Sequence, residues 1–277
     1  MLAALHILAG ILLPERGGSN NANDVAELYA LILVMAAIVF IGVEGALIWF
    51  LVRFKAKRGR VAAQIHGNTR LEIGWTVGAA VILVFITVVT FIKLPGIKNP
   101  PASTIDANGA KVASTTLLAS TDQPAPPKGA HLNIVVDGQQ YVWRYQYPRV
   151  ANKEVFAYEE MVVPVGMTVT LDITADDVAH SWWIPKLGGK MDALPGYTNH
   201  TWFRADKPGT YAGQCAELCG RNHANMLARV KAVPFDQYQA WYDRQAADIK
   251  AARDAGAKQR AAILAQQKQA AQRSASP

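Results

Sequence analysis

Two long apolar stretches constrain the fold more than any other feature of this 277-residue chain. Residues 28–52 and 73–92 are almost wholly apolar, and Glu44 is the only charged residue in either. The hydrocarbon layer of a bilayer is roughly 30 Å thick, and about 20 helical residues cross it. The sequence therefore predicts a transmembrane hairpin of two helices and excludes a soluble cytosolic enzyme.

Positive charge predicts the orientation of this hairpin. The segment between the two apolar stretches, residues 53–71, holds six basic residues and no acidic one. Short loops rich in Lys and Arg stay on the cytoplasmic side, so we expect both termini and everything after residue 92 on the outer side of a bacterial plasma membrane. Residues 101–245 carry 13 basic and 14 acidic residues, which gives no reason to infer nucleic-acid binding.

Composition divides the chain into five parts. Residues 1–24 form an N-terminal outer segment whose apolar start is either the remnant of a signal peptide or a short surface helix. The hairpin occupies 25–94, and a Pro/Ser/Thr-rich linker or insertion follows at 95–128. Residues 129–242 hold a β domain, and 243–277 are expected to be helical at first and then a flexible basic tail.

Short β-type runs separated by glycines fill the region after the linker. Many short strands with no helical pattern between them predict a β-sandwich or a Greek-key barrel. The expected strands are residues 131–136, 140–147, 160–165, 168–173, 201–204, 210–213 and 226–233.

One loop of the β domain concentrates soft metal ligands. Cys215, Cys219, His223 and Met226 follow one another closely, and His180 stands at the end of an expected strand. Copper in proteins prefers thiolate, imidazole and thioether ligands, and a blue-copper site uses one Cys, two His and a weak axial Met. The second Cys indicates a different site, in which two sulfurs bridge two copper ions.

Other uses of the two cysteines have to be weighed against a copper pair. A disulfide is common outside the cytoplasm, but it gives no reason for His223 and Met226 to follow. Zinc would accept two Cys and two His, but the Met would then be idle and the spacing is not that of a zinc finger. A copper chaperone with a Cys pair would not need Met226 either. The ligand types favour a dinuclear copper site.

These motifs resemble subunit II of haem-copper cytochrome c oxidases. The likeness is carried by residues 180–196 and 209–226 and extends from the first apolar stretch to about Tyr242. It implies a membrane-anchored all-β protein, in which a two-helix hairpin carries a cupredoxin-like Greek-key barrel with a dinuclear copper centre, CuA. The implied ligands are Cys215 and Cys219 to both coppers, His180 and Met226 to one, and His223 and the backbone carbonyl of Glu217 to the other.

The resemblance also implies roles for several acidic residues. The Glu217 carboxylate would bind a magnesium ion shared with subunit I, for which a carboxylate oxygen is a suitable hard ligand. Glu72, at the inner end of the second span, would lie near the mouth of a proton path in subunit I, although an acid at a helix N-terminus is equally expected from the helix dipole. Glu44 lies where an ionised group is costly, so we expect it to face a partner helix or to be protonated.

An aromatic run at residues 140–147 corresponds to the surface where this family accepts electrons. Tyr141 stands where the family usually has Trp, and Trp143 matches the second Trp of the family pattern. The alternate spacing favours Trp143 as part of an inward-facing strand surface instead. Trp182 and Trp183, beside a ligand His, are alternative surface aromatics.

Taken together, the resemblance implies an electron-accepting subunit of a respiratory cytochrome c oxidase. Electrons would pass from a c-type cytochrome to CuA and then to haem in subunit I, where oxygen reduction is coupled to proton pumping. Subunits I and III and membrane lipid are the expected partners. No Cys-x-x-Cys-His motif occurs, so we expect no haem in this chain and no catalytic residue of its own. The alternatives are a membrane-anchored copper chaperone and a quinol oxidase subunit II, which the intact copper ligands disfavour.

Overall fold

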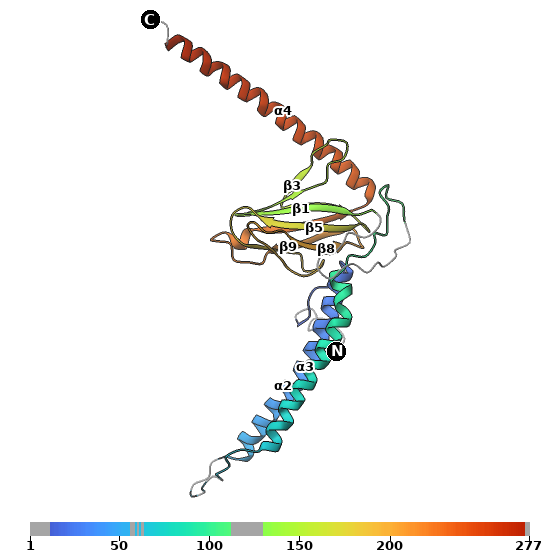
Figure 1. The fold of residues 1–277 in the computed structure, drawn as a ribbon, viewed down its shortest axis with the longest axis vertical. Helices are drawn as coiled ribbons and strands as arrows, with labels where there is room; N and C mark the ends of the chain where they lie inside the picture. The colour runs from blue at the N-terminus through green and yellow to red at the C-terminus, as the bar shows by residue number, and fades with distance from the viewer. Residues whose placement is uncertain (1–11, 56–58, 60, 62–63, 112–129, 275–277) are drawn as a thin grey trace.

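The computed structural model describes residues 12–55, 59, 61, 64–111 and 130–274. A helical hairpin carries a domain of two facing β-sheets, from which a long helix projects (Figure 1). Within the described residues, two helices are long and apolar enough to cross a membrane, and the strands form two five-stranded sheets. The predicted fold class is confirmed. The expected N-terminal segment at residues 1–14 lies almost wholly outside the described residues.

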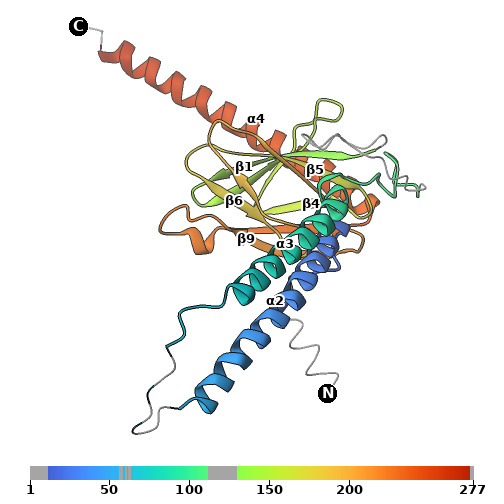
Figure 2. The ribbon, with the colours of Figure 1, turned by 60° about the horizontal axis from the view of Figure 1, so that its bottom comes forward.

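The two predicted spans form the central parts of two longer helices. Helix α2 runs from Asn20 to Arg53 and α3 from Thr69 to Lys98. The two helices lie side by side, with their connection at the end furthest from the β domain (Figures 1 and 2). Both helices extend beyond the apolar stretches, and their added end turns contain polar residues.

Side chains fasten both ends of the hairpin. At the inner end, Asn68 accepts a hydrogen bond from a backbone N–H in the first turn of α3 (3.2 Å), and Glu72 Oε1 accepts one from the Asn68 N–H (3.3 Å). These reciprocal bonds satisfy N–H groups that a helix start leaves unpaired. At the outer end, Lys93 Nζ lies 3.2 Å from Asp24 Oδ1 and 2.7 Å from Glu27 Oε2.

The β domain is a sandwich of mixed sheets. One sheet has the strand order β3-β2-β1-β5-β8 and the other β4-β10-β9-β6-β7. The β1–β5 and β4–β10 pairs are parallel, and the other strand pairs are antiparallel. The strands are β1 Leu132–Gln139, β2 Val142–Gln146, β3 Phe156–Tyr158, β4 Glu160–Pro164, β5 Thr168–Ala175, β6 His180–Trp183, β7 Met191–Ala193, β8 Asn199–Arg204, β9 Gly209–Cys215 and β10 Leu227–Val233.

Each expected strand corresponds to an observed one, but three short strands were not predicted. Strands β3, β6 and β7 have only three or four residues each, too few to show a clear alternation. His180 was placed at the end of a strand, whereas it is the first residue of β6. The start of β6 at His180 is decided by its pairing with two other strands. Strand β7 follows β6 after a turn, and β9 is distant from it in sequence.

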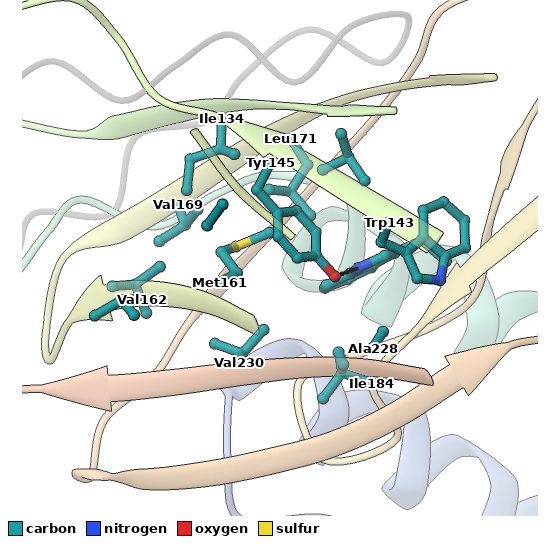
Figure 3. Close-up of a cluster of buried hydrophobic side chains, with 14 of the residues drawn as sticks. Ile134, Trp143, Tyr145, Met161, Val162, Val169, Leu171, Ile184, Ala228 and Val230 are labelled. Carbon is teal, nitrogen blue, oxygen red and sulfur yellow. Dashed lines mark hydrogen bonds between the residues drawn. The ribbon is translucent and has the colours of Figure 1, made fainter. Parts of the chain in front are cut away.

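The core lies between the two sheets (Figure 3). Trp143 and Tyr145 are fully buried in it, as the alternate spacing of β2 predicts. Trp182 Nε1 donates to the Tyr145 hydroxyl (3.3 Å), and its ring stacks on Phe203. The expectation that Trp182 is a surface aromatic is therefore wrong. It points inward because it lies two positions along β6 from the buried His180, on the same face of the strand.

The β domain rests directly on the outer end of the hairpin. Trp202 Nε1 donates to the backbone carbonyls of Ile97 and Lys98, both at 3.1 Å, in the last turn of α3. Arg204 Nη1 donates to the carbonyl of Ala102, which is buried. The first residues of the expected linker are therefore packed against β8, and residues 112–128 of that segment lie outside the described part.

Helix α4, from Phe235 to Ser274, begins on the β domain and then leaves it (Figure 1). Tyr238 and Tyr242 are buried, and Lys153 pairs with Asp243 at 2.7 Å. From residue 251 to residue 269 almost every side chain is exposed. A flexible tail was expected here, but the described helix continues to Ser274, because Ala, Gln, Lys and Arg are strong helix formers.

Gly213 of β9 lies directly against the backbone at the end of β6. A Cβ atom added there would lie 2.0 Å from the Trp183 carbonyl oxygen. We expect Gly213→Ala to push the two strands apart and lower the free energy of unfolding by about 1–3 kcal/mol. Gly189→Ala is the control, since its added Cβ meets no described atom within 4 Å. Urea unfolding of the detergent-solubilised chain measures both, and equal stabilities would contradict the close packing.

Candidate metal centre

Two neighbouring strands and one loop bring the sulfur and imidazole groups together. His180 begins β6 and Cys215 ends β9, and the two strands pair with Trp182 opposite Cys215. After Cys215 the chain turns through a loop and the 3₁₀ helix His223–Asn225, and it then returns along β10. The Cys215 N–H donates to the Met226 carbonyl at 2.9 Å, which closes the loop at its base.

The donor atoms of all six predicted ligands lie within one small cluster. Both cysteines are free, and their Sγ atoms are 3.9 Å apart, far beyond the roughly 2.05 Å of a disulfide. The donors of His180, Cys215 and Cys219 all lie within 4.8 Å of one another. Cys215 Sγ lies 3.8 Å from His180 Nδ1 and 3.3 Å from the Glu217 carbonyl oxygen. Cys219 Sγ lies 3.6 Å from His223 Nδ1 and 3.8 Å from Met226 Sδ.

This donor set fits a soft metal. A metal–sulfur bond is about 2.3 Å long, so two sulfurs on a common ion lie at most about 4.6 Å apart. The observed sulfur separation is within that limit. Two thiols, two imidazoles and a thioether are the groups that copper prefers. The imidazole of His180 lies beside Cys215 and that of His223 lies beside Cys219, so each ion of a bridged pair would have an imidazole of its own.

The cluster is dry on the side of the core and open at one edge. His180 and Met226 are fully buried, whereas His223 is partly exposed and Glu217 is exposed. Burial and, next, the nearby Cys215 raise the pKa of Cys219 to about 11. The thiol is therefore protonated at neutral pH when no cation is bound, and metal binding must release a proton.

A carboxylate that sequence reasoning missed orients His180. Asp177 Oδ1 lies 2.9 Å from His180 Nε2, which leaves Nδ1 directed toward Cys215. Burial acts to raise the pKa of Asp177, but hydrogen bonds from His180, Gln140 and Val178 outweigh it and hold the pKa below its ordinary value. A carboxylate on the far nitrogen fixes the tautomer and orientation of a ligand imidazole. The only sequence signal was an Asp three residues before the His.

The two aromatic residues proposed for electron transfer lie on different sides of the cluster. The buried Trp143 ring packs edge-on against His180, with ring centroids 5.8 Å apart. Tyr141 is partly buried, and its hydroxyl would be 2.6 Å from a Cβ added at Gly220, directly after Cys219. Glu72 is remote from the cluster, at the inner end of α3.

A buried carboxyl lies on β1. Asp137 is 8% exposed, and its Oδ1 has no hydrogen-bond partner among the described residues. The Gln139 amide nitrogen lies 3.5 Å from Asp137 Oδ2 and 2.5 Å from Asp176 Oδ2. Burial and, next, the charge of Asp176 raise the pKa of Asp137 to about 6.

This carboxyl predicts a pH-dependent stability. The pKa of Asp137 is higher in the folded chain than the ordinary 3.8, so the folded state binds the proton more tightly. Below about pH 4 the carboxyl is protonated in both states and the stability of the fold is unaffected. Between pH 4 and 6 the unfolded chain ionises more readily than the folded one, so stability falls, and the loss persists above pH 6. We expect Asp137→Asn to raise Tm by a few degrees at pH 8 and not at pH 4. Asp192→Asn, at an exposed position, should change Tm at neither pH; equal shifts for both variants would contradict the assignment.

Fold and site together define a membrane-anchored β-sandwich protein with a buried soft-metal site. Residues 9–92 match the family described as cytochrome c oxidase subunit II, transmembrane domain. Residues 151–233 match the family described as cytochrome c oxidase subunit II, periplasmic domain.

Two relatives agree with these matches, and one solved structure is reported with them. Cytochrome c oxidase subunit 2 of Cereibacter sphaeroides is 33% identical over 251 residues, covering 83% of this chain and 81% of the relative. That of Alkalihalophilus pseudofirmus is 35% identical over 221 residues, and the match spans 79% of this chain but only 57% of the relative. The crystal structure of the periplasmic domain of subunit II of cytochrome oxidase of Bradyrhizobium japonicum is 36% identical over 43% of this chain and 95% of that chain, with a TM-score of 0.40.

The chain belongs to the cytochrome c oxidase subunit II family, and the resemblance found in its motifs is confirmed. It is a membrane protein with two transmembrane helices and a periplasmic domain. The His180, Cys215 and Cys219 group is consistent with a CuA site.

Proposed function

We propose that this chain accepts electrons from a c-type cytochrome at a dinuclear copper centre and passes them to haem in a partner subunit. Oxygen is reduced in that partner, and the reaction is coupled to proton pumping. The observation that carries the proposal is the pair of unbonded sulfurs, 3.9 Å apart, with imidazole and thioether donors beside them. Family membership supports it.

The ligand roles follow the family pattern. Cys215 and Cys219 would hold both copper ions, His180 and Met226 would complete one, and His223 and the Glu217 carbonyl would complete the other. When bound, such a copper pair takes up and releases one electron at a time. The chain supplies a dry setting, because four of the donor side chains are buried, and Asp177 holds His180 in one tautomer. Little around the site has to rearrange when its charge changes.

The surface around Tyr141 is the proposed point of electron acceptance. Its contact with Gly220 supports this role, because it joins a partly exposed ring to the ligand loop. Trp143 has no exposed surface and contacts His180 instead, so its place is between the core and the metal rather than at the docking surface.

Two carboxylates complete the proposed contacts with subunit I. Glu217 is exposed beside the copper loop, where its side chain can bind a magnesium ion shared with that subunit. Glu72 lies at the inner end of α3, as a group at the mouth of a proton path requires. Its hydrogen bond from the Asn68 N–H also gives it a capping role, so the two functions share one side chain. The basic loop supports a bacterial plasma membrane location with both termini and the copper domain outside.

The two alternatives fit the geometry less well. A copper chaperone has to release its metal, whereas His180 and Met226 are completely enclosed by the domain. A quinol oxidase subunit II has no use for copper ligands, whereas here the sulfur, imidazole and thioether groups all converge.

Cys219→Ser tests the copper pair. We expect the variant to lose the mixed-valence two-copper signal in the paramagnetic spectrum, because one bridging sulfur is gone, while circular dichroism shows the same β content. Metal analysis of the purified oxidase should give two coppers per wild-type chain for this centre. An unchanged spectrum in the variant, or wild-type sulfurs joined as a disulfide, would overturn the proposal.

Met226→Leu tests the weak axial ligand. We expect both copper ions to stay and the reduction potential to shift by tens of millivolts, since an axial ligand tunes the potential. Met161→Leu makes the same substitution at a fully buried core position in β4, opposite Val230 of β10 and outside the ligand loop. Potentiometric titration compares the two, and equal potentials would show that Met226 is not a ligand.

A further inference from the structure

We infer that Gln140 is a positioning residue that ties the loop carrying Cys219 to the carboxylate that orients His180. The inference rests on the proposed copper centre, and it assigns to Gln140 a role distinct from electron acceptance by the neighbouring Tyr141. Three contacts support it: two are made by Gln140 at the turn between β1 and β2, and the third joins Asp177 to His180.

The main chain and the side chain of Gln140 reach different parts of the centre. Its backbone N–H donates to Asp177 Oδ2 at 2.7 Å, and the other oxygen of that carboxylate contacts His180 Nε2. Its side-chain amide nitrogen donates to the backbone carbonyl of Cys219 at 2.6 Å. One residue is thereby bonded to the support of one imidazole ligand and to the backbone of one sulfur ligand.

The ligand loop has few other attachments. The Ala216 N–H donates to the Ser181 carbonyl at 2.9 Å, and the next such attachment is the Met226 backbone at the start of β10. Among the described residues, the bond from Gln140 is the only hydrogen bond that residues 217–222 make outside the ligand loop 215–226. Leu218 is 78% exposed, so the side chain that packs this part of the loop against the core is that of the buried Cys219. The position of Cys219 Sγ therefore depends strongly on this amide.

The backbone of the loop is shaped to receive the turn. Gly220 has a φ of +132°, in the region that favours glycine. A Cβ atom at this position would lie 2.6 Å from Tyr141 Oη and 3.0 Å from Gln140 Nε2. The absence of a side chain thus lets the amide approach the Cys219 carbonyl.

The preceding residue provides a matched comparison. Gln139 carries the same side chain, but its amide contacts the carboxylates of Asp137 and Asp176 and no metal ligand. Replacing Gln139 by Leu removes the same amide group from the neighbouring position, but it leaves the hydrogen bond to the Cys219 carbonyl in place.

Copper retention in the purified oxidase tests the inference. We expect Gln140→Leu to release copper to an external chelator about 10–100 times faster than wild type, the range typical for loss of a partner that orients a ligand. Its paramagnetic spectrum should show altered copper hyperfine splitting, which a change in overall stability would not produce. Gln140→Glu, similar in shape but with no amide donor, should behave like Gln140→Leu, and Gln139→Leu like wild type. Wild-type release rates and spectra in both Gln140 variants would overturn the inference.

A metal-free measurement separates this inference from the proposed function. Amide hydrogen exchange of residues 217–222 in the copper-depleted chain should be faster in Gln140→Leu than in wild type and unchanged in Gln139→Leu. If wild-type oxidase held no copper here, the proposed function would fail while this difference in exchange would still report whether Gln140 holds the loop. Equal exchange in all three proteins would overturn the positioning role.

Discussion

The pairing of β6 with β9 is the interaction on which the rest of the site depends. It sets Trp182 opposite Cys215, so the imidazole at the start of β6 lies beside the sulfur at the end of β9. Gly213 permits this pairing, because any side chain there would meet the Trp183 carbonyl. The ligand loop then has to supply only the remaining donors, and it does so within one turn and one short 3₁₀ helix.

Around this pair the domain is organised in shells of decreasing burial. His180 and Met226 lie against the core, the two sulfurs are almost as deeply buried, and His223 reaches the edge. Asp177 fixes the deepest imidazole from behind, and the turn before β2 holds both that carboxylate and the loop. A soft-metal site thus receives a rigid interior and one accessible side, which suits a centre that exchanges electrons with separate partners.

Local patterns in the sequence predicted the elements that depend on local physics. The two apolar stretches and the close spacing of Cys215, Cys219, His223 and Met226 are features of single segments, and the structure has helices and a donor cluster there. The inward orientation of Trp182 and the start of β6 at His180 were missed because strand pairing over long sequence separations decides them. Gln140 was missed for the same reason, since it bonds to residues 37 and 79 positions away. Asp177 is only three residues from His180, but an Asp at that spacing does not by itself indicate a contact.

The hydrogen bonds from Trp202 to the last carbonyls of α3 have a mechanical consequence. A domain joined to its anchor by a flexible tether would sample many heights and tilts above the bilayer. Here the sandwich is hydrogen-bonded to the helix end itself, and a further hydrogen bond from Arg204 to the buried Ala102 stabilises the contact. We therefore expect a tilt of the hairpin within the lipid to move the sulfur cluster with it, so the anchor also sets the position of the cluster relative to the bilayer.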